Sequence, residues 1–359
     1  RGKARERNMK KLLDRIFIDG LSGMAQGLFA TLIIGTIIQQ IGTFTGGNIG
    51  DMIYMLGKVA AGMTGAGIGV GVARKLDAGH LVIVSAGVAG MVGAFAGKLL
   101  AGQVLVDGNL VLAGPGEPLG AFVAAYVAIE LGILISGKTK LDIILTPLVC
   151  IGAGSAVGLF VGPPISGFMT WLGSLINWGT EQQPFLMGIV VSVLMGMILT
   201  LPISSAALGV ILNLSGLAAG AATVGCCCNM IGFAVASWRE NKFGGFLAQG
   251  IGTSMLQVPN IVRHPLIWLP AILSSAILGP VGTMVLHMTN NATGSGMGTA
   301  GLVGSLMTWQ VMTQTESGTI VLFKIIIIQF VLPAVVTLLI SEFMRKKKWI
   351  KYGDMKLEL

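Results

Sequence analysis

The chain has 359 residues, of which 53% are hydrophobic and only 11% are charged, and its net charge is +8. Soluble domains carry about 25% charged residues, so this composition excludes an ordinary water-soluble globular protein. The 54 glycines lie within apolar runs, which excludes a disordered chain and favours closely packed or broken membrane helices. We therefore predict an all-α polytopic membrane protein embedded in a lipid bilayer.

The positive charge is concentrated at the two ends. Residues 1–15 form a basic arm and residues 342–359 form a basic tail. Because cytoplasmic segments next to membrane helices are enriched in Lys and Arg, we expect both termini to be cytoplasmic and the number of crossings to be even. The same rule accounts for the positive charge of the arm, so we do not expect nucleic acid as a partner. Residues 8–17 predict an amphipathic helix on the inner surface, and no signal peptide is recognised.

Five apolar segments fill residues 16–162, the predicted first transmembrane bundle. Each is long enough to cross a bilayer, and their ranges are 16–42, 49–73, 80–101, 119–136 and 141–161. Counted from a cytoplasmic start, the basic pairs at 74–75 and 138–140 fall inside, while Asp107 and Glu117 fall outside. The first half of the chain therefore supports the proposed orientation.

A different pattern follows at residues 163–183. Gly162-Pro163-Pro164 predicts a turn, after which Trp171 and Trp178 lie among Ser, Thr and Asn side chains. Tryptophan is enriched at the membrane–water interface, so we predict an interfacial amphipathic helix there.

The predicted second transmembrane part, residues 184–341, is less regular. Apolar segments at 184–201, 217–238, 265–288 and 319–340 predict spans, whereas 243–262 is interrupted by Gly, Gln and Pro. Counting 243–262 as a crossing gives about ten transmembrane helices, but it places Arg239 and Lys242 outside, against the positive-inside rule. The alternative is that 202–215 and 243–262 are re-entrant or broken segments. The pattern leaves both open.

Uncharged polar side chains gather in this second part. Polar residues in membrane spans are costly, and broken helices often mark a substrate site. The predicted solute-binding residues are Ser204, Ser205, Asn229, Thr253, Ser254, Gln257 and Asn260. Such neutral donors and acceptors suit a small polyhydroxylated solute, although helix–helix hydrogen bonding is an equal alternative. In the first half, Glu130 is either a proton or cation site or the partner of a nearby Lys or helix end.

The sequence gives no motif for a stand-alone catalyst. The glycine-rich runs at 65–69 and 294–298 do not belong to a βαβ unit, and no Walker sequence or Ser-His-Asp order is found. Three of the four cysteines are adjacent, at 226–228, which does not suit a zinc site. We expect no catalytic residue, metal or cofactor, and a transport subunit in place of an enzyme.

Several short motifs occur in an order typical of one family. They are Ile53-Tyr54-Met55-Leu56-Gly57-Lys58-Val59-Ala60, Ala73-Arg74-Lys75, Ile144-Leu145-Thr146-Pro147-Leu148, Gly162-Pro163-Pro164-Ile165, Trp171-Leu172 and Leu186-Met187-Gly188. Over residues 50–340 the chain resembles fructose-type enzyme IIC subunits of the bacterial phosphotransferase system. Within them it is most similar to a divergent branch of enzyme IIC-like or toxin-regulator-type membrane proteins. The resemblance implies a homodimeric permease of the bacterial inner membrane that moves a sugar-like solute by alternating access, with separate cytoplasmic phosphotransfer subunits as partners.

Two departures from the family pattern bear on phosphorylation. Residues 200–206 lack the family's acidic glycine-rich motif, and residues 252–260 keep a threonine and a proline without the family's glutamate. In the family that glutamate helps to hold a sugar hydroxyl for phosphorylation, so its absence argues against phosphorylation coupling. A second hypothesis is therefore a membrane sensor or regulator that keeps the fold without phosphotransfer. A channel is a weaker third hypothesis, because rings of charge are missing.

Overall fold

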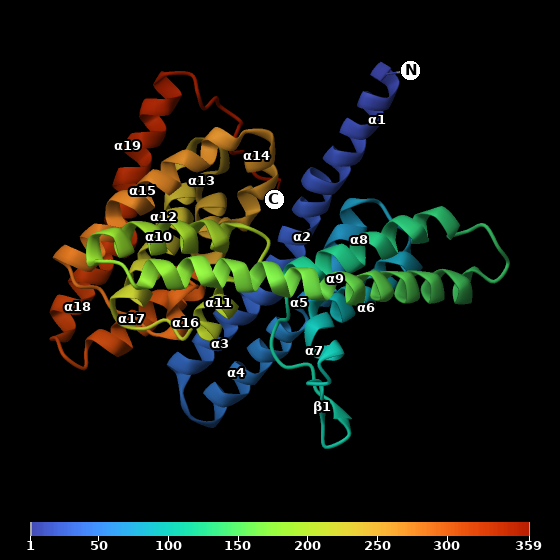
Figure 1. Ribbon diagram of the computed structural model, residues 1–359, viewed down its shortest axis with the longest axis horizontal. Helices are drawn as coiled ribbons and strands as arrows, with labels where there is room; N and C mark the ends of the chain where they lie inside the picture. Colours follow the sequence, from blue (N-terminus) through green and yellow to red (C-terminus); the bar gives the residue numbers. More distant parts are fainter. Residues whose placement is uncertain (1, 359) are drawn as a thin grey trace. The chain divides into compact units, whose positions relative to one another are not determined.

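The computed structural model describes residues 2–358, and 80% of it is helical (Figure 1). The chain forms two compact units, one ending at Phe168 and the other beginning at Met169. The high helical content confirms the predicted all-α fold class. Each unit is described by itself below.

Unit 1 begins with one long helical stretch. It passes through α1 (Gly2–Asp14), the π-helical η1 (Arg15–Gly20), α2 (Leu21–Leu28), the π-helical η2 (Phe29–Ile33) and α3 (Ile34–Thr45). Residues 8–17 were predicted as a surface helix, and they run into the first apolar segment without a break. Neither Pro nor Gly occurs among them, so nothing in that stretch ends the helix.

The remaining elements of unit 1 are shorter. They are α4 (Gly47–Gly62), α5 (Thr64–Lys75), α6 (His80–Ala94), α7 (Ala96–Leu100), β1 (Leu105–Val106), β2 (Asn109–Leu110), α8 (Pro118–Ile135) and the first part of α9 (Asp142–Thr180). The single span predicted at 49–73 is interrupted, because α4 and α5 meet at an angle of 51°. Strands β1 and β2 pair as a hairpin whose turn residues, Asp107 and Gly108, both have positive φ.

Glycines bring two helices of unit 1 into close contact. Gly23 and Gly27 on α2 face Gly67 and Gly71 on α5, and both pairs have a spacing of four residues. A Cβ atom on Gly27 would overlap the carbonyl oxygen of Gly67. Such small-residue faces let membrane helices pack backbone to backbone, which is the role expected of glycines in apolar runs.

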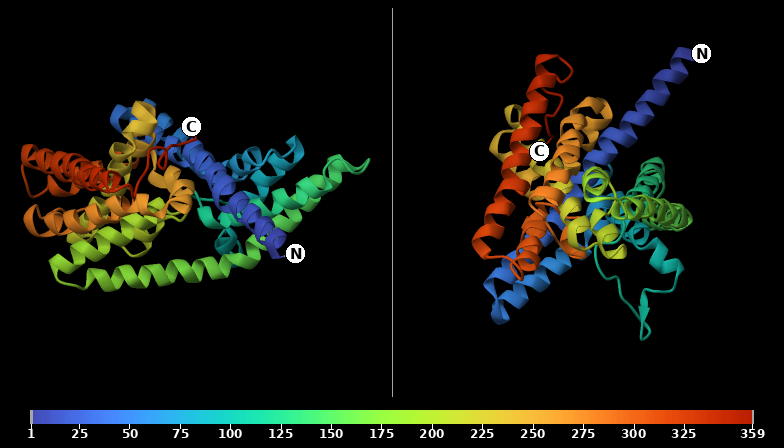
Figure 2. Two further views of the ribbon diagram at one scale, coloured as in Figure 1. Left: turned by 90° about the horizontal axis from the view of Figure 1, so that it is seen from above. Right: turned by 60° about the vertical axis from the view of Figure 1, so that its left-hand side comes forward.

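Helix α9 corrects one prediction. The turn predicted at Gly162-Pro163-Pro164 is wrong, because α9 continues through these residues to Thr180 (Figure 2). The two prolines remove only the hydrogen bonds to residues 159 and 160, a loss that membrane helices tolerate. The outer face of α9 is apolar, with Ile143 73% and Phe160 82% exposed.

Unit 2 contains the end of α9 and sixteen further helical elements in the described residues. They are α10 (Pro184–Thr200), α11 (Ser205–Ile211), α12 (Gly216–Ala236), α13 (Trp238–Leu247), η3 (Ala248–Gly252), η4 (Ser254–Gln257), α14 (Val258–Arg263), η5 (Pro265–Trp268), α15 (Leu269–Pro280), η6 (Val281–Val285), α16 (Ala292–Ser295), η7 (Ala300–Leu302), α17 (Val303–Met312), α18 (Gly318–Ile325), η8 (Ile326–Val331) and α19 (Leu332–Lys346).

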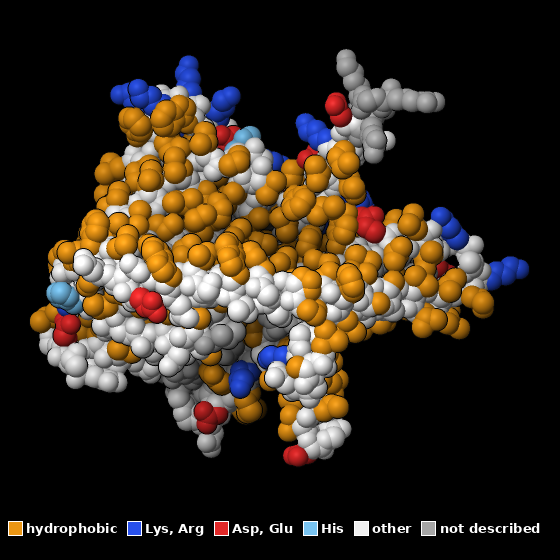
Figure 3. Space-filling model, in the orientation of Figure 1, with side chains coloured by type: hydrophobic (Ala, Val, Ile, Leu, Met, Phe, Trp, Pro, Cys, Tyr) orange, Lys and Arg blue, Asp and Glu red, His pale blue; other side chains and the backbone are white. Residues whose placement is uncertain are grey.

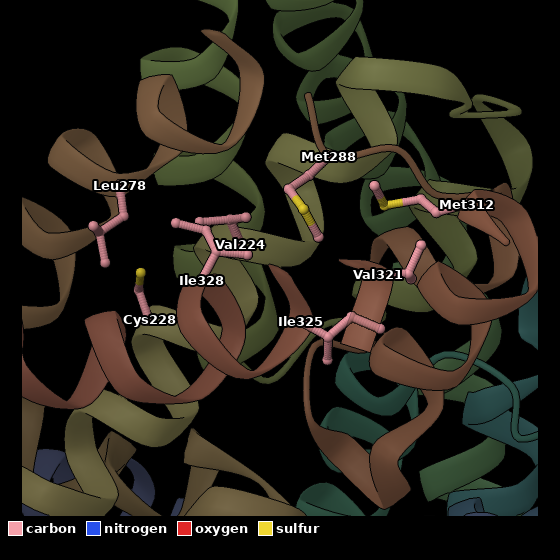
Figure 4. Close-up of a cluster of buried hydrophobic side chains, with 8 residues drawn as sticks. All are labelled: Val224, Cys228, Leu278, Met288, Met312, Val321, Ile325 and Ile328. Atoms are coloured by element: carbon pink, nitrogen blue, oxygen red, sulfur yellow. The ribbon is translucent and has the colours of Figure 1, made fainter. Parts of the chain in front are cut away.

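Helix α12 is the centre of unit 2. It contacts α10, α15 and α19, and 94% of its most apolar 18-residue stretch is buried within the protein. One apolar core cluster places Val224 and Cys228 of α12 beside Leu278 of α15 and Ile328 of η8 (Figure 4). On the face of unit 2 drawn in Figure 3, hydrophobic side chains cover the helices, and Lys and Arg side chains gather where α19 ends.

Within residues 2–358, six helices are long and apolar enough to cross a membrane. They are Glu6–Thr45, Pro118–Ile135, Asp142–Thr180, Gly216–Ala236, Pro265–Val285 and Gly318–Lys346, and the bent α4–α5 pair would make a seventh. Helices α6 and α10 are apolar but shorter. The predicted number of about ten spans is therefore not confirmed.

Candidate solute-binding site

The predicted irregular segment of unit 2 is broken in the structure. After α13, the chain forms the π-helical η3, extends at Thr253 (φ −156°, ψ 139°) and resumes as η4 and α14. Pro259 lies in the first turn of α14, where the missing N–H costs little. Residues 202–215 likewise form only the short α11 between turns. Both segments are thus broken, and their re-entrance into a membrane stays a prediction.

A first group of buried polar side chains surrounds Asn229 of α12, and we call it the Asn229 cluster. The Oδ1 atom of Asn229 accepts hydrogen bonds from Thr200 Oγ1 at 3.2 Å and from Trp268 Nε1 at 3.0 Å. Its Nδ2 atom donates to Ser275 Oγ at 3.4 Å. The hydroxyls of Thr200 and Ser254 share a hydrogen bond of 2.7 Å. This cluster therefore joins α10, α12, α15 and the broken segment.

A second group forms a chain of amides on the broken segment, and we call it the Gln257 cluster. Gln249 Nε2 donates to Ser237 Oγ at 2.9 Å, and Gln257 Nε2 donates to Gln249 Oε1 at 2.7 Å. Asn260 Nδ2 donates to Gln257 Oε1 at 2.9 Å. All four side chains are buried. An amide side chain is able both to donate and to accept, so the chain can exchange partners with a solute hydroxyl.

The structure distributes the seven predicted residues unevenly. Asn229 and Ser254 lie in the first cluster, and Gln257 and Asn260 lie in the second. Thr253 accepts from Met255 N at 3.1 Å, which caps η4. Ser204 and Ser205 turn to other partners, since Ser204 Oγ accepts from Ala207 N and Ser205 Oγ donates to the Gly296 carbonyl at 2.6 Å. Every predicted residue thus has a partner in the protein, as the helix–helix bonding alternative also requires.

Sequence reasoning missed several members of these clusters. Ser275 is a polar residue within an apolar span, the signal that selected the others, whereas Ser237 lies at a helix end and carries no such signal. Trp268 gives no sequence signal either, because tryptophan near a span end is typical of the membrane interface. Only the packing of α15 on α12 brings its indole to Asn229.

A further buried polar group lies around Asn290. Its Nδ2 atom donates to Thr223 Oγ1 at 2.8 Å, to the Gly304 carbonyl at 3.0 Å and to Thr308 Oγ1 at 3.1 Å. Gln329 of η8 donates to the same Thr308 hydroxyl at 3.0 Å. This group fixes the glycine-rich stretch after α16 against α12 and η8.

Glu130 of unit 1 has a basic partner. Its Oε1 atom accepts from Arg15 Nε at 2.6 Å, with the two side chains about one-third exposed. This contact agrees with a partner role for Glu130, with an arginine in place of the expected lysine or helix end. Within residues 2–358, no group of three or more His, Cys, Asp or Glu side chains is placed to hold a metal ion.

The fold and these clusters define an α-helical membrane protein with apolar helices of spanning length and buried, uncharged polar groups. A family model described as phosphotransferase system, EIIC, matches residues 18–357. The chain belongs to this family, which confirms the resemblance found in the sequence and makes it a membrane component of sugar transport. No curated protein matches the chain.

Proposed function

We propose that this protein is a permease that moves a small polar, sugar-like solute across the bacterial inner membrane by alternating access. In this proposal it is a homodimer with both termini cytoplasmic and about ten crossings. Residues 163–183 are its interfacial helix, between the bundle at 16–162 and the part at 184–341. Helix α9 extends about 58 Å over its 39 residues, roughly twice the hydrocarbon thickness, so a single crossing leaves part of it for the interface.

The observation that carries the proposal is the meeting of buried, uncharged amides and hydroxyls at a broken helix. Residues next to the break near Thr253 join both clusters, since Ser254 belongs to the Asn229 cluster and Gln249 and Gln257 belong to the Gln257 cluster. A polyhydroxylated solute needs both donors and acceptors in its site, and amide and hydroxyl side chains supply both. The solute would replace hydrogen bonds that these side chains now make with one another. Ser204 and Ser205 would complete the site in another conformation of α11.

The broken segment also argues against transport that requires phosphorylation of the solute. Residues 252–260 contain no Asp or Glu, so no carboxylate there can orient a sugar hydroxyl for phosphoryl transfer. We infer transport without dependence on phosphotransfer subunits. A sensor or regulator that keeps the fold is the second candidate, and the missing carboxylate favours it equally.

The test is uptake by purified protein in proteoliposomes, with radiolabelled fructose, glucose, mannitol and galactitol as probes. We expect uptake of at least one probe, and about a tenfold loss with Gln257→Ala, which removes one amide from the buried chain. Ser204→Ala should reduce uptake less. The matched control is Asn177→Ala, an exposed asparagine on α9.

The outcomes separate the candidates. Equal uptake by Gln257→Ala, Ser204→Ala and the unchanged protein would remove the site assignment. Uptake that requires added phosphocarrier protein and its phosphate donor would identify a phosphotransferase permease. Absence of uptake with every probe, under both conditions, would favour the sensor.

A further inference from the structure

The segment after α19 folds back over unit 2. We call residues 350–358 the strap, and Figure 1 shows it running from the end of α19 to the neighbourhood of α14. Lys348 (φ 63°) reverses the chain direction just before it. Ile350 and Met355 are almost fully buried, in an apolar cluster with Phe233 of α12 and Ile267 of η5. The strap is thus packed against the protein through Ile350, Met355 and Leu357, while Tyr352 and Lys356 between them are exposed.

Polar contacts fix the same segment from two directions. Asn241 of α13 forms a two-point clamp, because its Nδ2 atom donates to the Met355 carbonyl at 2.8 Å and its Oδ1 atom accepts from Leu357 N at 2.8 Å. His264, which follows α14, lies 3.6 Å from the Asp354 carboxylate. These contacts lie outside the proposed solute site.

The strap also reaches into the proposed site. Gln257 Nε2 donates to the Met355 carbonyl at 3.0 Å, and Asn260 Nδ2 donates to the Lys356 carbonyl at 2.8 Å. Two amide donors that a solute hydroxyl would require are therefore occupied by backbone carbonyls of the same chain. A carbonyl and a hydroxyl oxygen are equivalent acceptors for such an amide, so the strap and a polyol compete for the same groups.

We propose that the strap is a tethered competitor that closes the Gln257 end of the solute site, and that its release opens this end. The proposal rests on the proposed function, because it assigns a regulator to that same site. The tether keeps the carbonyls at high effective concentration, so a free solute gains access only when the clamp at Asn241 opens. Residues 355–357 move in this step, while Ile350 keeps the segment attached.

The experiment uses single introduced cysteines to measure two events separately: release of the strap and opening of the solute site. Met355→Cys reports exposure of the strap, and Ser254→Cys reports access to the site, with neutral 2-hydroxyethyl methanethiosulfonate as the reagent. Both positions are buried, and so are the four native cysteines, whose thiols should stay unmodified as long as the fold is intact. We expect slow modification of both reporters in the otherwise unchanged protein.

Opening the clamp should then raise the modification rates of both reporter cysteines together. Asn241→Ala removes both clamp bonds, and Leu357→Pro removes the N–H from the strap side, so each should raise both rates about tenfold. Asn177→Ala is the control and should change neither. If the strap reporter accelerates while the Ser254→Cys rate stays constant, the strap does not close the site. If neither variant exposes Met355→Cys, the strap is a fixed part of the fold, which also overturns the proposal.

These rates do not depend on transport, so they stand even if no probe is taken up. Where the probes are transported, Asn241→Ala should raise the initial rate of fructose uptake, whereas Gln257→Ala should lower it. Accelerated modification of Ser254→Cys without uptake of any of the four probes would leave the strap mechanism in place and refute the choice of solute.

Discussion

The buried ion pair between α13 and α19 gives the sharpest stability prediction. Arg345 Nη2 donates to both carboxylate oxygens of Glu240, at 2.8 and 3.1 Å, and to the Ala236 carbonyl at the end of α12, at 3.1 Å. The Glu240 side chain is fully buried, and that of Arg345 is 8% exposed. After Arg345→Met, Glu240 would keep a single weak partner, the Gly353 N–H at 3.3 Å.

The expected loss of unfolding free energy follows from the burial of this ion pair. Leaving one charge of a buried pair uncompensated costs about 3–5 kcal/mol, so Arg345→Met should lower the free energy of unfolding by that amount. Glu240→Gln combined with Arg345→Met removes both charges and should recover much of the loss. The neighbouring pair of Arg239 with Glu342 is exposed, with side chains 56% and 39% accessible. Arg239→Met should therefore cost no more than about 1 kcal/mol.

The assay is equilibrium unfolding in mixed dodecyl maltoside and SDS micelles, followed by circular dichroism and tryptophan fluorescence. The two arginine variants remove the same charge from adjacent ion pairs. The difference between their unfolding free energies therefore reports the effect of burial. Equal losses for Arg345→Met and Arg239→Met would refute the reasoning. A double variant as unstable as Arg345→Met alone would show that lost packing, and not the unpaired charge, causes the effect.

Two further predictions use the same unfolding measurement. Gly225→Ala should lower stability by about 1–3 kcal/mol, because a Cβ atom there would overlap the Ser192 carbonyl on α10, whereas Gly244→Ala meets no atom within 4 Å and should be nearly neutral. Gly225→Ala as stable as Gly244→Ala would show that α10 and α12 can separate without cost. Asn290→Ala removes the buried amide whose two N–H groups face the acceptors on Thr223, Gly304 and Thr308, and it should cost roughly 1–3 kcal/mol. A change below about 0.5 kcal/mol would mean that other groups take over its acceptors.

Much of the fold could be predicted because apolar segments of spanning length depend only on local composition. The predicted segments at 119–136, 184–201 and 217–238 differ from α8, α10 and α12 by no more than two residues at either end. The family was likewise recognisable from the order of short motifs, which the family match confirms. Local composition failed where a signal was ambiguous. A double proline predicts a turn in water, but α9 continues through it. No residue pattern in 49–73 predicted the bend between α4 and α5.

The candidate site shows the same division. Composition identified polar residues that are costly in a membrane, and Asn229, Ser254, Gln257 and Asn260 are all buried and hydrogen-bonded. It could not identify the partners that come from distant parts of the chain. Trp268 reaches Asn229 across 39 positions, and Asn241 holds Met355 across 114. The sequence by itself determined a glycine-rich, apolar α-helical membrane protein of the EIIC family, because hydropathy and motif order are local properties. Only the tertiary structure decided which amides meet and that residues 350–358 cover them, because hydrogen bonds between distant residues exist only once the helices have packed.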